Sequence, residues 1–372
     1  MPARLEINLS NLKNNILNIQ KYVKNKSNGK DTEILAMVKA DAYGAGIVEV
    51  SKTLEEIGIK YFGVAYLKEA KMLRESGIRS NIVVFSGLLP ENIEEAVNID
   101  VAYAISNLEI AKMLDGKAKE YNKKVKIHIA IDTGMGRIGV LPKNIINFAN
   151  ELKQLNNLEV EGMFSHFSSA DSDIAYTQKQ SNIFNECVEE FKKEGIQPNY
   201  IHICNSIGMV KYNTSYNDMV RVGIAMYGYL DKEMLNNYEI SLKGIFKLSA
   251  PVCDIRIVAK GESIGYSRTY ITDKETKIAT LQIGYADGLN RLLSNKYSLN
   301  INGKEAKILG NICMDMTMID VTDIDDIHVG DYVNIFDFDD NKLNMMAEIC
   351  NTINYEIIST IGKRVDRKYI YN

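Results

Sequence analysis

Short apolar segments alternate with amphipathic ones through the first 240 residues, and this alternation restricts the fold more than any other feature of the sequence. Each apolar segment is rich in β-branched residues and is followed by a stretch, such as residues 107–121, with helical spacing of its apolar positions. That order is typical of parallel strands connected by helices. The predicted strands are residues 34–38, 61–65, 82–85, 101–105, 125–131, 158–164, 200–203 and 219–222. Eight such units favour a closed (β/α)8 barrel, or TIM barrel, which usually takes about 250 residues.

The pattern changes near residue 241, where the amphipathic stretches give way to short strand-like segments separated by Gly and Asp. These segments are residues 244–258, 277–284, 304–309 and 332–336. Asn302-Gly303 lies between two short alternating runs and is a strong signal for a tight β-hairpin. We therefore expect a barrel domain over residues 1–240 and a β-rich domain over residues 241–372.

Charge and composition exclude several classes of protein. The formal net charge is −4 and no block of basic residues is present, so a nucleic-acid partner is not expected. No run approaches the ~18 apolar residues of a membrane span, and the N-terminus lacks the apolar core of a signal peptide, so a cytoplasmic protein without a membrane partner is expected. The five cysteines are widely spaced without a C-x-x-C pair, which favours free thiols over disulfides or a metal site.

Barrel enzymes carry their working residues on the loops that follow the strands, so polar residues at those positions are candidates. Lys39 directly follows the first predicted strand, in AMVKADAYGAG. Burial at the end of an apolar strand lowers the pKa of a lysine and makes its amine a better nucleophile. The alternative is a solvated lysine at a strand end, and position alone leaves both interpretations open.

Further candidates follow the later strands. Arg137 and His166 follow the fifth and sixth, and Arg221 ends the eighth. Ser206 follows the seventh strand, and Gly223 and Ile224 offer backbone N–H groups just beyond the eighth. Barrels often bind phosphate between these last two loops, so a phosphate site is expected there.

Taken together, these segments resemble the alanine racemase family over essentially the whole chain. The matching segments are AMVKADAYGAG, IDTGMGRIGV, SHFSSAD, NSIG, RVGIAMYG, GYSRTY, IGYADGLNR, GNICMDMTMIDVT and NTINYEIISTIGKRV. The resemblance implies a barrel domain, a β domain, pyridoxal 5'-phosphate as cofactor, and a homodimer whose two active sites are shared between subunits. No metal is implied.

The resemblance also implies two bases. Lys39 would hold the cofactor covalently and act as the base on the D-side of the α-carbon, and Tyr266, supplied by the partner subunit, would serve the L-side. Racemisation needs bases on opposite faces, because one removes the α-proton and the other returns a proton from behind. A tyrosine is a weak base, so His166 and Arg221 would polarise Tyr266.

The remaining site residues are carried over in the same way. Arg221 would bond the pyridine nitrogen, and because an arginine has no proton to lose at working pH, that nitrogen would stay unprotonated. The weaker electron sink that results suits racemisation better than competing reactions. The implied phosphate ligands are Tyr43, Ser206, Gly223, Ile224 and Tyr355, and the implied substrate-facing residues are Arg137, Met314 and Asp315, the last two from the partner subunit.

The chain departs from the family pattern at a few positions. Ala45 and Asn290 replace a customary histidine and proline, and Ala130 replaces a lysine that is carbamylated in many members. Because Ala130 carries no charge, we expect a small inorganic anion, most simply chloride, beside Arg137; the alternative is water or an acidic side chain from elsewhere in the chain. His128 is interpreted as a core histidine, and His202 and His328 receive no role.

Other functions remain open at this point. A serine or broad-specificity racemase on the same scaffold is the nearest alternative. A non-catalytic pyridoxal-phosphate carrier would lack the β domain, which counts against it. A decarboxylase would need a protonated ring nitrogen, which Arg221 disfavours.

Overall fold

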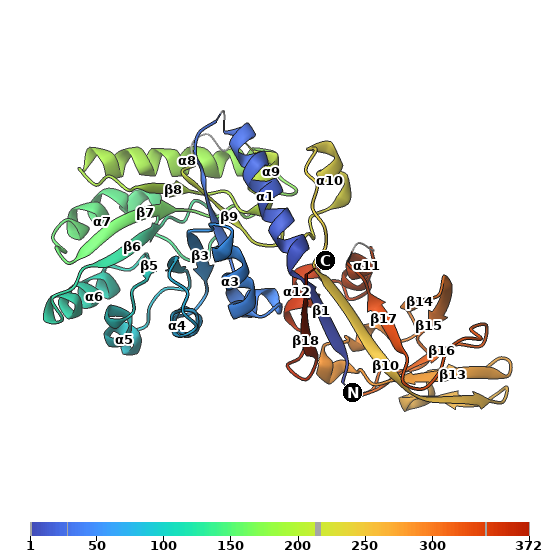
Figure 1. The fold of residues 1–372 in the computed structure, drawn as a ribbon. Coiled ribbons are helices and arrows are strands. Elements are labelled where there is room, and N and C mark those ends of the chain that lie inside the picture. The colour runs from blue at the N-terminus through green and yellow to red at the C-terminus, as the bar shows by residue number, and fades with distance from the viewer. Residues whose placement is uncertain (1, 28, 213–216, 339–340, 372) are drawn as a thin grey trace. The chain divides into compact units, whose positions relative to one another are not determined.

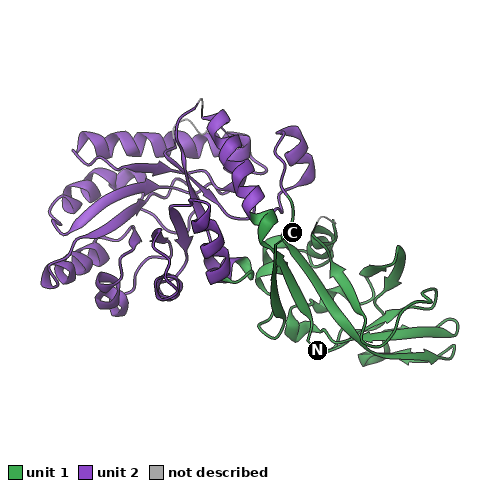
Figure 2. Ribbon diagram, in the orientation of Figure 1, with its two compact units in different colours: residues 1–12, 43–46, 243–372 green, residues 13–42, 47–242 purple. Residues whose placement is uncertain are grey.

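The computed structural model describes residues 2–27, 29–212, 217–338 and 341–371, and it separates into two units. Residues 13–42 and 47–242 form the barrel unit, and residues 1–12, 43–46 and 243–372 form the β-rich unit (Figure 2).

Eight parallel strands form the inner wall of the barrel unit in its described part (Figure 1). Along the sheet they lie in the order β8 (Tyr200–His202), β7 (Leu158–Phe164), β6 (Val125–Ala130), β5 (Ala102–Ile105), β4 (Asn81–Val84), β3 (Tyr61–Val64), β2 (Glu33–Met37) and β9 (Met219–Val222). Backbone N–H groups of Asp218 and Arg221 donate to carbonyls of Ile201 and Cys204, which joins β9 to β8. The predicted barrel, with each strand within a residue or two of its predicted place, is confirmed.

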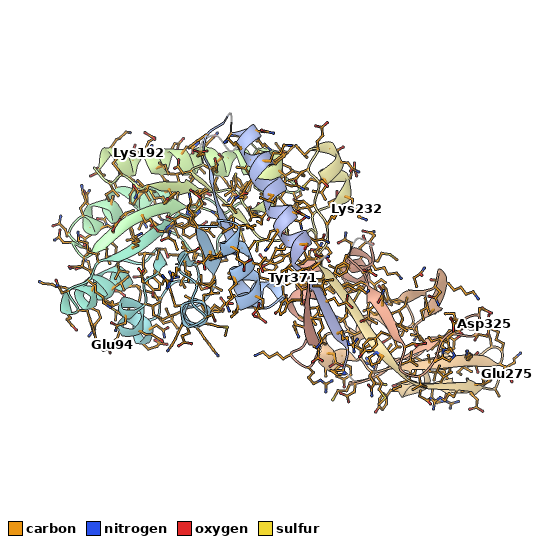
Figure 3. All side chains as sticks on the ribbon, in the orientation of Figure 1. Glu94, Lys192, Lys232, Glu275, Asp325 and Tyr371 are labelled. Carbon is orange, nitrogen blue, oxygen red and sulfur yellow. The ribbon has the colours of Figure 1, made fainter. Side chains whose placement is uncertain are left out.

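Helices follow the strands because their apolar residues recur on one face. In α1 (Leu9–Lys26) the residues Leu12, Ile16, Ile19 and Val23 share that face and are buried. The other helices of this part are α2 (Lys39–Tyr43), α3 (Ile47–Glu56), α4 (Leu67–Glu75), α5 (Ile93–Asn98), α6 (Leu108–Glu120), α7 (Ile145–Leu152), α8 (Ile174–Lys193), α9 (Ser206–Lys211) and α10 (Lys232–Asn237). Charged side chains such as those labelled on α5 and α8 point away from the strands (Figure 3).

The β-rich unit is built on a mostly antiparallel sheet. Its strands run in the order β16 (Thr317–Asp320), β13 (Thr276–Leu281), β10 (Phe246–Val258), β1 (Arg4–Asn8) and β18 (Asp366–Ile370), and β17 (Tyr332–Phe336) also pairs with β10. Two hairpins, β11 (Ser263–Ile264) with β12 (Tyr270–Ile271) and β14 (Ser298–Ile301) with β15 (Lys304–Lys307), and the helices α11 (Lys342–Ile349) and α12 (Asn354–Ser359) complete it. Asn302 and Gly303 have positive φ, +52° and +81°, at the predicted β14–β15 turn.

The N-terminal strand lies in a different unit from the one the sequence pattern suggests. We expected residues 1–240 to form one domain, but β1 pairs antiparallel with β10 and parallel with β18. The observed units therefore assign residues 1–12 to the β-rich unit. Within the described residues, no helix is both long enough and apolar enough to cross a membrane.

Candidate active site

Lys39 starts a left-handed turn of the backbone. The four residues after it, residues 40–43, have φ between +52° and +56°, although none of them is glycine. Left-handed helical backbone costs an L-residue about 1–2 kcal/mol, because Cβ approaches the following carbonyl oxygen. Such a run persists only where its surroundings hold it in place.

Two carboxylates hold this turn. Glu69 Oε1 accepts a hydrogen bond from the Ala40 backbone N–H at 2.6 Å, while its Oε2 accepts from the Ala65 N–H at 2.8 Å. Asp41 Oδ1 accepts from the Ile47 N–H at 2.8 Å. Glu69 thus ties the turn after β2 to the end of β3, which fixes the backbone from which Lys39 extends.

The amine of Lys39 lies among positive charges. Burial lowers the pKa of Lys39, the charges of Arg137 and Arg221 lower it further, and the Glu69 carboxylate partly opposes them. Its ammonium makes no hydrogen bond or ion pair with any described residue. A lysine of lowered pKa with an uncommitted amine is a better nucleophile and proton acceptor than an ordinary lysine.

Arg221, at the end of β9, is a buried cation held by neutral groups. Only 4% of its surface is exposed. One terminal nitrogen donates to the carbonyl and to Nδ1 of His202, at 3.0 and 2.8 Å. The other donates to the carbonyls of Ser165 and Ile203 and to Nδ1 of His166, at 2.7, 3.0 and 3.0 Å. No carboxylate of the described chain contacts it, and burial lowers its pKa to about 10.

His166 is held in one neutral form by this contact. Burial, followed by the charges of Arg221, Arg137 and Lys39, lowers the pKa of His166 to about 2. A guanidinium can only donate, so Nδ1 of His166 accepts and Nε2 carries the proton. His166 therefore presents a hydrogen-bond donor on the side of the ring away from Arg221.

A second group of donors lies around Ser206, the first residue of α9. The Ser206 hydroxyl accepts from the backbone N–H groups of Gly223 and Ala225, at 3.0 and 3.4 Å. The N–H of Ile224 has no hydrogen-bond partner within the described residues, although Ile224 is only 1% exposed. Buried backbone N–H groups are rarely left without a partner, so this arrangement suits an anion.

Tyr43 and Tyr355 belong to the β-rich unit, where their rings lie 6.0 Å apart between centroids and are tilted by 47°. Burial and the neighbouring Tyr355 raise the pKa of Tyr43, so its hydroxyl stays protonated.

Tyr266, Met314 and Asp315 lie together on the surface of the β-rich unit, around an open hollow of about 470 Å³. Tyr266 is 70% exposed and Met314 is 52% exposed. Gly265, Ser267 and Arg268 all have positive φ, so Tyr266 is presented on an irregular turn. The Asn311 side-chain amide donates to the Tyr266 carbonyl at 2.8 Å and supports that turn.

Asp315 is already paired. Arg364 donates to Asp315 Oδ1 at 2.8 Å and also bridges to Asp287 at 2.9 Å. Arg137, in contrast, is exposed and forms no ion pair with a described residue. Ala130 is 1% exposed and packs with Ala104 and Phe164.

The barrel unit thus brings together Lys39, Arg137 and Arg221, whose charges act on one another and on the neutral His166. The β-rich unit groups Tyr266 with Met314 and Asp315. Sequence reasoning missed Glu69, because its position in a helix gives no sign that its carboxylate accepts a hydrogen bond from Ala40. It also assigned no function to the buried histidines His128 and His202. No sequence pattern distinguishes these two histidines from packed core histidines.

Comparison with known proteins gives one family. The model of the alanine racemase N-terminal domain matches residues 7–231, and that of the C-terminal domain matches residues 245–369. The chain is 41% identical to the alanine racemase of Clostridium novyi, over 100% of this chain and 96% of the relative. The solved alanine racemase of Clostridium difficile superposes with a TM-score of 0.94 at 34% identity, covering 100% and 96% of the two chains.

A third relative is described with a ligand. The alanine racemase of Bartonella henselae, solved with covalently bound pyridoxal phosphate, matches with a TM-score of 0.88 at 28% identity over 100% of both chains. Two family models match residues 7–231 and 245–369, and a relative is aligned over 96% of its own length, so this chain belongs to the alanine racemase family of isomerases.

Proposed function

We propose that this protein interconverts L- and D-alanine with pyridoxal 5'-phosphate held on Lys39. The observation that carries the proposal is that Lys39, an amine of lowered pKa, lies within the electrostatic influence of Arg221. Arg221 is a buried cation that no described carboxylate neutralises. The B. henselae relative with covalently bound pyridoxal phosphate supports the same cofactor.

The residues present fit that cofactor. The uncommitted amine of Lys39 suits attachment to an aldehyde. The Ser206 hydroxyl with the N–H groups of Gly223 and Ile224 suits its phosphate, since Ile224 otherwise leaves a buried donor without a partner. Arg221 Nε makes no hydrogen bond to a described residue and is the donor left for the ring nitrogen. Tyr43 and Tyr355 remain proposed phosphate ligands.

Pyridoxal phosphate, when bound, draws electrons from the substrate's α-carbon and so acidifies its hydrogen. Lys39 removes or returns the α-proton on one face. Tyr266 of a second copy does so on the other face, and His166 donates its Nε2 proton toward that phenolic oxygen. Arg221, which cannot give up its proton near neutral pH, keeps the ring nitrogen unprotonated.

We infer a homodimer with shared active sites from the exposure of the second group. Tyr266 is 70% exposed in one chain, whereas a group that removes a proton from a substrate works in a site from which water is excluded. A second copy that covers Tyr266, Met314 and Asp315 would supply the missing surroundings. Arg137 stays the proposed contact to substrate within one chain.

The test is direct. Purified protein is supplied with pyridoxal phosphate and L-alanine, and D-alanine is followed by chiral chromatography while the absorbance spectrum reports cofactor attachment. Formation of D-alanine, and of L-alanine from D-alanine, is expected. A spectrum showing attachment without conversion would point to a carrier, and release of carbon dioxide would point to a decarboxylase.

Parallel assays with serine and lysine decide whether the enzyme is alanine-specific, a serine racemase or a broad-specificity one.

A further inference from the structure

Four buried polar side chains form a hydrogen-bonded line through the inside of the barrel, which we name the interior chain: Glu161, His128, His202 and Arg221. They come from β7, β6, β8 and β9, and each is 0–4% exposed. Glu161 Oε2 lies 3.1 Å from Nε2 of His128. His128 Nδ1 lies 3.0 Å from Nε2 of His202, and His202 Nδ1 lies 2.8 Å from Arg221.

The two ends of the interior chain determine where its protons lie. Arg221 can only donate, so Nδ1 of His202 accepts and its single proton is on Nε2. That proton points at His128, whose Nδ1 must accept and whose proton is therefore also on Nε2. This last proton points at Glu161, and an ionised carboxylate can only accept. Both ends thus require the same arrangement, with every bond directed from Arg221 toward Glu161.

The charges agree with this direction. Burial opposes ionisation of Glu161, but hydrogen bonds from His128 and Lys126 outweigh it and hold the pKa of Glu161 below its usual range. Lys126 reaches Glu161 at 2.8 Å from the surface. Burial and the charge of Arg221 lower the pKa of His202 well below its ordinary value, so His202 stays neutral.

Neighbouring residues pack closely against the two imidazole rings of the interior chain. Gly162 lies beside His128, and a Cβ there would fall 2.4 Å from His128 Nδ1. Phe164 stacks on the His202 ring at 5.4 Å with an interplanar angle of 15°. The register of β6 and β7 shifts between Ile127 and His128. The close approach of Gly162 and the stacked Phe164 ring hold the two imidazoles in place by packing.

We propose that Glu161, through His128 and His202, is the distant counter-charge and positioning group for Arg221. A carboxylate in direct contact would neutralise Arg221 where its charge is needed. Two neutral imidazoles instead polarise and orient the guanidinium through their hydrogen bonds, and the negative charge stays on Glu161 at the far end of the interior chain. Glu161, His128 and His202 are positioning residues. Their effect on the reaction rests on the proposed function, but the direction of the interior chain does not.

The direction is tested by ¹⁵N NMR of the full-length, cofactor-loaded protein labelled in its histidine rings. The chain has four histidines, so single His→Asn variants assign every signal. We expect His128 and His202 to be neutral, each with its proton on Nε2. A proton on Nδ1 of either ring, or on both nitrogens of one ring, would overturn the interior chain. The wild-type spectrum decides this point whatever happens to a variant.

The effect on catalysis is tested with Glu161→Gln, which retains an acceptor oxygen and removes the charge. We expect kcat for alanine to fall about tenfold or more while KM stays unchanged, because the group acts on Arg221 and touches no substrate. Glu159→Gln makes the same chemical change at an exposed position of β7 and should retain wild-type values. Unchanged kcat in folded Glu161→Gln would refute the positioning role.

Gly162→Ala provides a second route if Glu161→Gln fails to fold. Its Cβ displaces His128 without removing any charge, so the same loss of kcat at constant KM is expected, with altered ring signals for His128. Altered signals with wild-type kcat would contradict the proposal. If the wild-type protein neither attaches pyridoxal phosphate nor racemises alanine, the proposed function fails, and the NMR result still decides the direction of the interior chain.

Discussion

The two units treat their polar side chains in opposite ways. In the barrel unit Arg221 is 4% exposed, and both of its terminal nitrogens are fully engaged by carbonyls and imidazoles. In the β-rich unit Tyr266 is 70% exposed and Asp315 is occupied by Arg364 at the surface. The charged and polar groups of the barrel unit are therefore preorganised within a single chain. Those of the β-rich unit need a second surface before they can become reactive.

Left-handed backbone presents a key side chain in both halves of the molecule, Lys39 in one and Tyr266 in the other. The two turns differ in how firmly hydrogen bonds hold them. The turn at residues 40–43 is held by the carboxylates of Glu69 and Asp41. The turn around Tyr266 has positive φ at Gly265, Ser267 and Arg268 and is supported by Asn311. Five predictions test how far this contrast between a preorganised and an incomplete half extends.

The largest effect is expected for the preorganised half. Lys39→Ala should reduce racemisation below detection in both directions and abolish the absorbance of lysine-attached cofactor, because it removes an anchor and a base together. Spectra and chiral assays measure both. Lys52→Ala, an exposed lysine on α3, is the control and should behave like the wild type. Turnover that persists together with the attached-cofactor absorbance would refute the role of Lys39.

Tyr266→Phe should act on one direction of proton removal. We expect exchange of the α-proton of L-alanine to slow about 10²–10⁴-fold, as for loss of a positioned acid–base group, with cofactor attachment intact. Deuterium exchange into L- and D-alanine measures this. Tyr270→Phe, in the same short segment, is the control. Equal slowing for the two enantiomers would contradict a face-specific role.

Mixing the two inactive variants sharpens the comparison. If each site takes Lys39 from one chain and Tyr266 from the other, a mixed dimer holds one intact site. Random exchange of subunits should then restore about a quarter of wild-type activity. Dilution below the dimer dissociation constant should remove it again. Full activity in a demonstrated monomer would rule out shared sites.

Acid should weaken the barrel unit first. His202 is buried and neutral, with a pKa well below the ordinary 6.5, so the unfolded chain binds the extra proton as pH falls below 6.5. Stability is therefore full above that pH and falls by about 1.4 kcal/mol per pH unit below it, for each such histidine. The histidine of residues 243–372 is His328, whose side chain is 72% exposed.

Hydrogen exchange read by mass spectrometry at pH 7.5 and 5.5 compares the two units in one sample. Barrel strands should lose protection at the lower pH while the strands of the β-rich unit keep theirs. His328→Asn should leave the result unchanged. Equal loss in both units would show that the buried histidines do not set the acid response.

The smallest effect concerns Arg137, which has no ion-pair partner among the described residues. If chloride lies beside it, replacing chloride with gluconate at constant ionic strength should change the KM for alanine a few-fold, because the guanidinium loses its neutralising ion. Crystals grown in bromide should show an anomalous peak there. An Asp or Glu carboxylate found against the guanidinium would disprove the idea.

Sequence patterns predicted most of the fold because its periodicities are regular. Strands such as β7 and β9 have the predicted bounds, since each is a short buried run between turn residues. The place of β1 was missed, although Leu5 and Ile7 are buried and alternate with Arg4 and Glu6. Five residues show a strand but not its partners, because β10 and β18 lie more than 200 residues away.

The candidate site likewise contains residues that the sequence pattern predicted and residues that it did not. Positions after strands predicted Lys39, His166 and Arg221, because chain order places strand ends at one edge of a barrel. The roles given to Tyr266 and Asp315 came from resemblance alone and stay predictions. The interior chain could not be foreseen, since no sequence pattern tells a packed histidine such as His128 from one bonded to a buried carboxylate.

The place of β1 between β10 and β18 has a consequence for synthesis. On the ribosome β1 is made more than 200 residues before its partners β10 and β18, which is on the order of tens of seconds earlier at ordinary elongation rates. The barrel strands can pair meanwhile, whereas β1 must wait with both edges open. Arg4 and Glu6 on its outer face are the kind of charges that discourage such an edge from aggregating before its partners arrive.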